Sequence, residues 1–292
     1  MSTYPTLAHA LSQAQALGLP RIDAQLLLLH TVGRLQAGRA WLLAHDQDEL
    51  TSEEHARYLA LCERRHAGEP VAYLTGVKEF FGLTLQVDAR VLDPRPDTET
   101  LVEWALEVAH ATTQAAEAAE PHPPLRIIDL GTGSGAIALA LQHQLPGAAI
   151  TAVDASADAL AVAQANGERL GLPVQCVRAN WLEGVDDRFD MIVSNPPYIR
   201  SDDPHLAALT HEPLSALASG ADGLADIRSI VAQAPAHLVP GGWLLLEHGW
   251  DQAADVAALL TQAGFTQVQH RNDLAGIARC TGGQWPPSVP SR

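Results

Sequence analysis

The chain has 292 residues, of which 47% are hydrophobic and 18% charged, and its formal net charge is −16. This length allows one large domain or two unequal ones, each with a buried core. A protein that grips bare DNA or RNA needs a basic surface to neutralise phosphates, so the acidity argues against free nucleic acid as a substrate.

The cysteines and the apolar segments predict a cytoplasmic protein. Cys62, Cys176 and Cys280 are scattered and lack CxxC spacing, which is typical of reduced thiols rather than of disulfides or a zinc site. The first residues lack the basic and apolar regions of a signal peptide, and no apolar run reaches the roughly 18 residues of a membrane span. We expect a monomer without a metal and without membrane contact.

The first part of the chain predicts helices, and the second part a hairpin. Over residues 1–78, apolar side chains recur at helical spacing and Gly and Pro separate the segments, which indicates a small helical domain. Alternating residues over 79–94 predict a β-hairpin that links the two domains. A helix from Asp97 to about Ala118 should follow, and the stretch 112–124 is interpreted as the end of this helix and a loop.

After Pro124, strand and helix patterns alternate to the end of the chain. This alternation predicts a mostly parallel, doubly wound sheet over residues 95–292, of the Rossmann-like α/β class. The expected strands are 126–130, 150–154, 174–178, 189–194, 243–247, 266–270 and 276–280, and the expected helices are 135–144, 157–170, 227–238 and 252–263.

A glycine-rich turn joins the first of these strands to its helix and predicts a cofactor site. Gly131, Thr132, Gly133 and Gly135 form the turn, where glycine lets the backbone take positive φ and lets a ligand approach the helix N-terminus. Asp154 ends the next strand, where an acid can accept both hydroxyls of a ribose. The same glycine spacing also fits a dinucleotide.

Two further features favour S-adenosylmethionine over a dinucleotide. Asp129 places a carboxylate near the site, which the ammonium group of an amino-acid tail can use and which would repel a pyrophosphate. Asn180 and Trp181 follow the third strand, where a polar and an aromatic side chain can flank adenine. A turn or helix-capping role for Asp129 is the alternative.

The motif Asn195-Pro196-Pro197-Tyr198 follows a strand and indicates the chemistry. Prolines fix φ and donate no hydrogen bond, so the Asn side-chain oxygen and a proline carbonyl provide two acceptors for the two hydrogens of an NH₂ group. Tyr198 can pack on a flat amide or base. The motif therefore predicts methylation of an amide or amine nitrogen, which needs positioning rather than a strong base.

The chain resembles the protein-(glutamine N5) methyltransferases of the PrmC/HemK family. The resemblance covers nearly the whole chain and includes residues 64–76, the Glu79-Phe80-Phe81-Gly82-Leu83 segment, the Pro94-Arg95-Pro96-Asp97-Thr98-Glu99 segment, Glu212-Pro213, and residues 244–249. Asp93 stands where the family usually has an apolar residue, and the 112–124 stretch is longer than in the family.

The resemblance implies a seven-stranded sheet, S-adenosylmethionine as the methyl donor, and the glutamine of a Gly-Gly-Gln tripeptide in class I peptide chain release factors as the acceptor. It implies that Asn195 and Pro196 bind the glutamine amide and that Tyr198 packs on it. Phe80 or Phe81 would line the methyl pocket. We expect residues 1–78 to dock the release factor away from the active site, and the alternative is that they only support the packing.

Three other functions remain open on the sequence. An adenine N6 methyltransferase uses the same motif, although the acidic charge argues against it. A glutamine methylase that acts on a large-subunit ribosomal protein would differ in the N-terminal domain. A non-catalytic S-adenosylmethionine-binding protein would have no need of the intact motif at residues 195–198.

Overall fold

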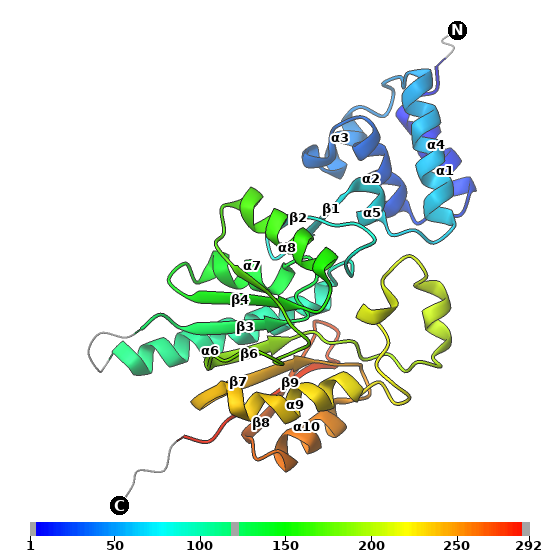
Figure 1. The fold of residues 1–292 in the computed structure, drawn as a ribbon. Coiled ribbons are helices and arrows are strands. Elements are labelled where there is room, and N and C mark those ends of the chain that lie inside the picture. Colours follow the sequence, from blue (N-terminus) through cyan, green and yellow to red (C-terminus); the bar gives the residue numbers. More distant parts are fainter. Residues whose placement is uncertain (1–3, 118–122, 288–292) are drawn as a thin grey trace, which may run out of the picture. The chain divides into compact units, whose positions relative to one another are not determined.

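The protein is described by a computed structural model that covers residues 4–117 and 123–287. The chain forms two compact units, Met1–Val77 and Lys78–Arg292. Figure 1 labels the elements of both. The hairpin that the sequence analysis assigned to a linker lies almost wholly in the second unit.

The first unit is a bundle of helices around an aliphatic core. Leu27, Leu28 and the ring of Tyr58 are fully buried there. The helix that carries Tyr58 begins with a capping box, in which the side chains of Thr51 and Glu54 each bond the other residue's backbone N–H, and this fixes its first turn. The helices are α1 (Leu7–Ala16), α2 (Arg21–Thr31), α3 (Arg39–Ala44), α4 (Ser52–His66) and α5 (Val71–Thr75), with a 3₁₀ turn η1 (Leu35–Ala37).

The second unit begins with a hairpin that is shorter than the sequence indicated. Strands β1 (Val77–Phe80) and β2 (Leu83–Gln86) pair with each other, and residues 87–95 are irregular. A 3₁₀ turn η2 (Pro96–Thr98) leads into the long helix α6 (Glu99–Glu117). The expected loop beyond this helix falls partly on residues 118–122, which lie outside the described residues.

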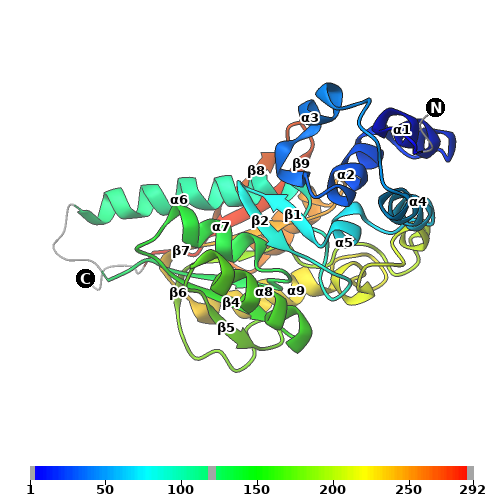
Figure 2. The same cartoon turned by 90° about the horizontal axis from the view of Figure 1, so that it is seen from above.

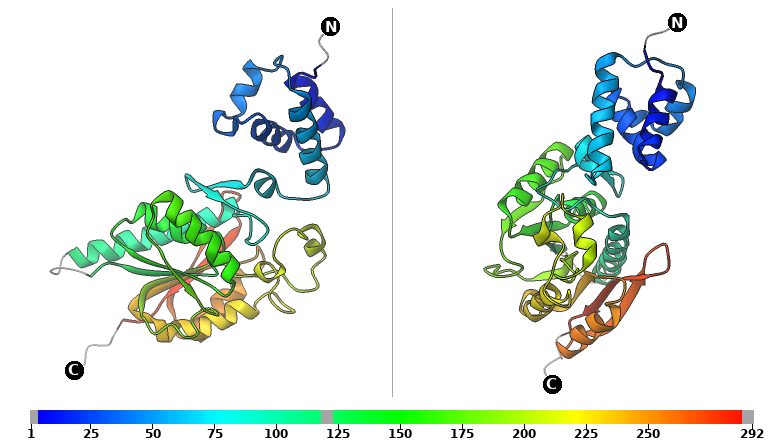
Figure 3. Two further views of the ribbon diagram at one scale, coloured as in Figure 1. Left: turned by 45° about the horizontal axis from the view of Figure 1, so that its top comes forward. Right: turned by 90° about the vertical axis from the view of Figure 1, so that its right-hand side faces the viewer.

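A seven-stranded sheet forms the centre of the second unit, as expected. Its order is β5-β4-β3-β6-β7-β9-β8; β7–β9 and β9–β8 are antiparallel and the remaining pairs are parallel. Figure 3 shows the sheet from two directions, with the last hairpin in orange and red at one edge. The strands are β3 (Arg126–Leu130), β4 (Ala149–Asp154), β5 (Gln175–Arg178), β6 (Phe189–Ser194), β7 (Leu238–Glu247), β8 (Thr266–Asn272) and β9 (Ala278–Gln284).

Two of these strands differ from their predicted bounds by more than two residues. The strand predicted at 243–247 begins at Leu238, because residues through the Pro240-Gly241-Gly242 stretch continue beside β6 with an irregular register. The strand predicted at 276–280 begins at Ala278 and continues to Gln284, because Asp273 binds the backbone N–H groups of Ala275 and Ile277 and forms the hairpin turn there.

Helices cover both faces of the sheet (Figures 1 and 2). On one face, Leu244 and Leu246 join residues of α9 and α10 in one buried cluster. On the other face, a side chain at Gly282 would meet Trp104 of α6. Because successive side chains of a strand point to opposite faces, α9 and α10 cover one face of β7 and β9, and α6 covers the other. The remaining helices are α7 (Ala136–Gln144), α8 (Ala157–Leu170), α9 (Ala225–His237) and α10 (Ala253–Gln262).

The parallel register brings the ends of the central strands to one edge. Leu130 at the end of β3 pairs with Val153 of β4 and with Ser194 of β6, and Ser194 pairs with Leu246 of β7. The segments that follow these strands therefore meet at the carboxyl edge, where open α/β sheets bind ligands. A long connection with two 3₁₀ turns, η3 (Pro204–Ala208) and η4 (Leu214–Ala216), follows β6.

Candidate functional site

A cavity of about 270 Å³ opens at the carboxyl edge of the sheet. It brings together the glycine turn after β3, the end of β4, the residues after β5 and the motif after β6. The lining residues named by the sequence analysis are Gly131, Gly133, Asp154, Asn180, Trp181, Asn195 and Pro197. Residues from four separate strand ends thus share one cavity, because the register places those ends side by side.

The backbone of the glycine turn lets another group approach it closely. Gly131 has φ 71°, and a Cβ atom there would lie 3.2 Å from the ring of Trp181. The backbone N–H of Gly133 donates to Asp154 Oδ2 at 3.0 Å, while Ser156 donates its N–H to Asp154 Oδ1 at 2.9 Å. These bonds fix the Asp154 carboxylate at the cavity wall, and the remaining lone pairs of its oxygens can accept two ribose hydroxyls.

Asp129 lies behind the turn and is fully buried. Its Oδ2 accepts the Thr132 hydroxyl at 2.6 Å and the backbone N–H of Ala138 at 3.2 Å, so part of the capping role considered from the sequence is present. Oδ1 has no hydrogen-bond partner among the described residues. Burial, with a smaller contribution from nearby Asp154, raises the pKa of Asp129 to about 7. Asp129 is not among the residues that line the cavity, and its unpartnered oxygen behind the glycine turn is a group whose buried charge an ammonium could satisfy.

Thr132 and Gly135, which the sequence analysis also assigned to cofactor binding, do not line the cavity. Thr132 is buried and orients Asp129. Gly135 has φ 84°, and a Cβ atom there would lie 3.0 Å from Leu139 and 3.3 Å from the backbone of Ala163. Gly135 therefore permits the close packing of α7 on α8, and both residues support the turn from behind.

Trp181 and Asn180 follow β5 and line the cavity, with the Trp181 ring next to the glycine turn. Trp181 takes a positive φ of 55°, which is uncommon for an aromatic residue, and its ring lies over Gly131. The backbone is thus held in an unfavourable conformation that presents the flat ring to the cavity.

The motif at residues 195–198 follows β6 directly. The Asn195 side chain donates from Nδ2 to the hydroxyl of Thr98 at 3.1 Å, and its Oδ1 accepts no hydrogen bond from any described residue. Pro196 is buried, and Pro197 lines the cavity. The arrangement leaves the side-chain oxygen of Asn195 available to accept an N–H from a ligand.

Tyr198 is held at both of its polar ends. Its hydroxyl donates to Glu247 Oε1 at 3.3 Å, and its carbonyl accepts from Gln252 Nε2 at 3.0 Å. Burial and the neighbouring Glu247 raise the pKa of the Tyr198 hydroxyl above its usual range, so this group stays protonated. A neutral, fixed ring is suited to packing on a flat amide.

The two phenylalanines of the hairpin are not among the residues that line the cavity. Phe80 is fully buried, whereas Phe81 is partly exposed with φ 49°, and its N–H donates to Glu99 Oε1 at 3.0 Å. Phe81 is therefore the more accessible ring, and its role beside a methyl group remains a prediction.

Several residues at the site were not identified by the sequence analysis. Thr98 and Glu247 are buried behind Asn195 and Tyr198, although the segments that contain them were noted for their resemblance. Glu247 could have been found from the sequence, because it is the last residue of the strand that pairs with β6 and so lies at the carboxyl edge of the sheet. The cavity is also lined by Arg90, Val91, Leu92, Pro213, Ser215, Ala216 and Asp226.

An ion pair between the buried Glu212 and the partly exposed Arg95 anchors the connection that supplies Pro213 to the cavity. Arg95 binds Glu212, and Glu212 Oε2 also accepts the backbone N–H of Asp93 at 3.3 Å. The Asp93 side chain in turn lies 3.1 Å from Lys78 Nζ. Asp93 is thus accommodated by its cationic neighbours Lys78 and Arg95.

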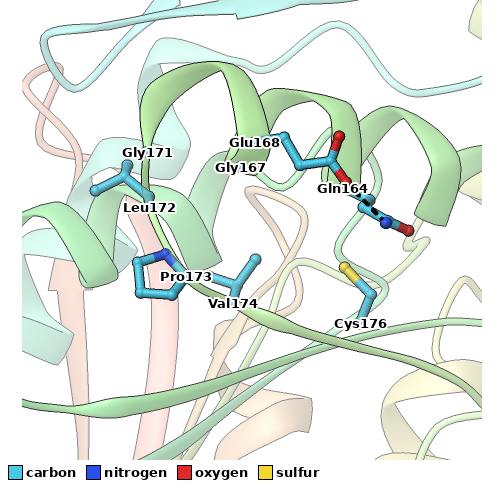
Figure 4. A pocket seen from close by; sticks show the side chains of 8 residues that line it. All are labelled: Gln164, Gly167, Glu168, Gly171, Leu172, Pro173, Val174 and Cys176. Atoms are coloured by element: carbon cyan, nitrogen blue, oxygen red, sulfur yellow. Dashed lines mark hydrogen bonds between the residues drawn. The ribbon is translucent and has the colours of Figure 1, made fainter.

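A second hollow lies at the edge of the sheet that β5 forms. It is formed by the C-terminal half of α8 and the amino end of β5, and Figure 4 shows Gln164 and Glu168 bonded to each other there, with Cys176 nearby. Burial raises the pKa of the Cys176 thiol, so it is a poor nucleophile. This hollow gathers no set of groups that suits catalysis.

The described residues form neither a metal-binding cluster nor a helix that could span a membrane. No group of three or more His, Cys, Asp or Glu side chains in residues 4–117 and 123–287 is arranged to hold a metal ion. Within the same part of the chain, no helix has the length and apolar character needed to cross a membrane.

Comparison with known proteins points to a methyltransferase family. Residues 6–76 match the family described as PrmC N-terminal domain, and residues 108–220 match the family described as Methyltransferase small domain. A release factor glutamine methyltransferase of Bordetella pertussis is 49% identical over 91% of this chain and 95% of its own length. One of the same name from Escherichia coli is 44% identical over 96% of this chain and 97% of its own.

Solved structures show the same fold at lower identity. A methyltransferase from Pyrococcus furiosus has a TM-score of 0.50 and 18% sequence identity. The match covers 82% of this chain and 100% of that chain. The hMettl16 catalytic domain has a TM-score of 0.55 and 17% identity, with 83% of this chain and 84% of that chain covered.

Proposed function

The chain belongs to the family of release factor glutamine methyltransferases, and we propose that it transfers a methyl group from S-adenosylmethionine to the side-chain amide nitrogen of the glutamine in the Gly-Gly-Gln motif of class I release factors. The observation that carries the proposal is the Asn195 side chain, whose Nδ2 donates to the Thr98 hydroxyl and whose Oδ1 accepts no hydrogen bond from the described residues. Adenine methylation is not favoured, because the relatives that match along almost the whole chain are named as release factor methyltransferases.

The residues present fit the donor. Asp154 would accept the ribose hydroxyls, Asn180 and Trp181 would flank the adenine, and the orphaned Oδ1 of Asp129 would accept the ammonium group. Bound there, S-adenosylmethionine supplies an electrophilic methyl group on a sulfonium sulfur. Gly131 and Gly133 would hold it through the backbone of their turn, without side chains in its way.

The acceptor nitrogen is activated by position. Asn195 Oδ1 and the carbonyl oxygen of Pro196 would each accept one N–H of the glutamine amide, which returns electron density to a nitrogen whose lone pair is shared with its carbonyl. Tyr198 would pack on the amide plane. Fixing the reactants at roughly 3–3.5 Å can supply about 7–11 kcal/mol of the barrier reduction in well-oriented cases. One N–C bond forms, one S–C bond breaks, and the nitrogen releases one proton.

Methyl transfer to a purified release factor tests this function. The protein is incubated with donor labelled in its methyl group, and label should appear on the factor and be absent from a factor whose Gly-Gly-Gln glutamine is replaced by alanine. Asn195→Ala should reduce transfer by roughly a hundredfold or more, because one acceptor of the amide is lost, while donor affinity changes by less than about threefold. Label that persists on the alanine factor, or that transfers to bare DNA instead, would sink the assignment.

We also propose that the helical unit of residues 1–77 docks the release factor away from the reacting glutamine. Support comes from its match to the PrmC N-terminal domain, and the lining residues of the cavity at the sheet edge belong to the second unit. Its exposed Ile22 and Leu43 offer apolar contacts. A cytoplasmic location and a protein substrate rather than nucleic acid belong to the same proposal.

A further inference from the structure

The ring of Tyr198 can pack on the acceptor amide only if the backbone at residue 198 is held in place. The two prolines before it fix their own φ angles, but they do not fix ψ of Tyr198 or the path of the chain beyond it. Because the ring is attached to the Cα atom, a shift of the backbone carries the ring with it. The protein therefore needs a contact that fixes this end of the motif.

Gln252 supplies this contact from the start of α10. Its Nε2 donates to the Tyr198 carbonyl at 3.0 Å, and its Oε1 accepts the backbone N–H of Gly249 at 2.8 Å. Nε2 also donates to the Asp222 carbonyl at 3.5 Å. One side-chain amide thus joins the motif after β6, the end of β7 and the connection that leads to α9.

These partners determine which end of the Gln252 amide faces the motif. The Gly249 N–H can only donate, so it requires the side-chain oxygen, and the Tyr198 carbonyl can only accept, so it requires the NH₂ group. A half-turn of the amide would set donor against donor and acceptor against acceptor. Gln252 is only 7% exposed, so water has little access to replace either bond.

Gly223 allows the Gln252 amide to reach the motif. Gly223 has φ 76°, and a Cβ atom there would overlap the Tyr198 carbonyl oxygen and lie 2.7 Å from Gln252 Nε2. The hydrogen bond between Gln252 and Tyr198 therefore requires a residue without a side chain beside it. The other end of Tyr198 is held separately, since its hydroxyl donates to Glu247 Oε1 at 3.3 Å. The residue is thereby fixed both at its backbone and at the tip of its ring.

We infer that Gln252 is a positioning residue for methyl transfer: its NH₂ group holds the Tyr198 carbonyl and so keeps the Tyr198 ring aligned for packing on the acceptor amide. Gln252 is not among the residues that line the cavity, so it acts through Tyr198 and not on the donor. This inference rests on the proposed function, since it names a residue that supports recognition of the glutamine amide at the same site.

The test compares variants of the full-length protein in the transfer of labelled methyl groups to a release factor. Gln252→Glu keeps the shape and, when ionised, accepts the Gly249 N–H but cannot donate to the Tyr198 carbonyl. Gln252→Met fills a similar space and bonds neither group. Gln142→Met is the matched control, because Gln142 is also buried and donates from Nε2 to the Leu145 carbonyl, at the far end of α7 from the glycine turn.

Both Gln252 variants should lower kcat on the order of tenfold to a hundredfold, because the ring that positions the acceptor is displaced. The Kd for S-adenosylmethionine, measured by calorimetry, should stay within about twofold of the wild type, since Gln252 lies outside the cavity lining. Gln142→Met should keep the wild-type kcat, even where it lowers Tm as much as Gln252→Met does. An equal loss of kcat in Gln142→Met would overturn the inference.

A double variant shows whether Gln252 acts through the ring. Tyr198→Ala removes the ring and keeps the backbone carbonyl, so adding Gln252→Met to it should lower kcat by less than about twofold. Full multiplication of the two losses, or a wild-type kcat in Gln252→Met alone, would overturn the inference. A wild type that transfers no methyl group to the release factor would instead overturn the proposed function, and this inference with it.

Discussion

Replacing Asp129 by Asn tests how the site recognises the amino-acid end of the donor. The carboxyl group is buried, Thr132 and Ala138 occupy Oδ2, and Oδ1 has no partner among the described residues. Burial raises its pKa to about 7. An ammonium group beside Oδ1 would favour the ionised form and return the pKa to roughly its usual range near 4. Donor binding near neutral pH should therefore release a proton from Asp129.

The sign and size of the effect follow from this shift. Below pH 7 the free protein holds Asp129 mostly protonated, so binding must remove that proton and affinity falls as the pH falls. The apparent Kd increases by a factor of 1 + 10^(7−pH), which is about 11 at pH 6 and about 1.3 at pH 7.5, and the affinity should thus weaken about eightfold across this range. Asn cannot ionise, so Asp129→Asn should bind weakly with almost no slope.

Isothermal titration calorimetry with S-adenosylmethionine measures both quantities. Titrations from pH 6 to 7.5, in two buffers with different ionisation enthalpies, give the Kd and the number of protons released. Asp190→Asn is the matched control, because Asp190 lies at the opposite end of the neighbouring strand, where it binds the Arg126 N–H. It should keep the wild-type slope. A wild-type Kd that is constant over this range, or an equal slope in Asp129→Asn, would refute the reasoning.

Two further predictions concern the sheet and the helical unit. A Cβ atom at Gly282 would lie 2.6 Å from Leu245 and 2.7 Å from the Leu244 carbonyl, so Gly282→Ala should lower the free energy of unfolding by about 3 kcal/mol in urea denaturation. The control variant Gly147→Ala has nothing within 4 Å of the new Cβ atom and should change this free energy little. Equal stability of the two variants would contradict the packing at β9. Amide hydrogen exchange within residues 6–76 should slow when a release factor is added and not when the donor alone is added, and protection confined to residues 78–292 would exclude docking on the helical unit.

The sequence by itself determined the fold class and the family, and it named seven of the residues that line the cavity. The glycine turn and the motif at residues 195–198 could be identified because each is a run of neighbours whose chemistry depends on local backbone geometry. Alternation of strands and helices then predicted the parallel sheet, and parallel strands must bring their carboxyl ends to one edge. The relatives confirm the predicted family, and the seven-stranded sheet confirms the predicted fold class.

Only the tertiary structure decided which neighbours orient these residues. Thr98 and Glu247 are separated by most of the second unit in sequence. Glu247 meets Tyr198 because β7 pairs with β6, and Thr98 meets Asn195 because η2 lies beside the segment that follows β6. No spacing rule could assign Thr132 and Gly135 to positions behind the cavity wall. A hydrogen bond depends on atomic positions to within a few tenths of an ångström, and packing of distant segments sets those positions.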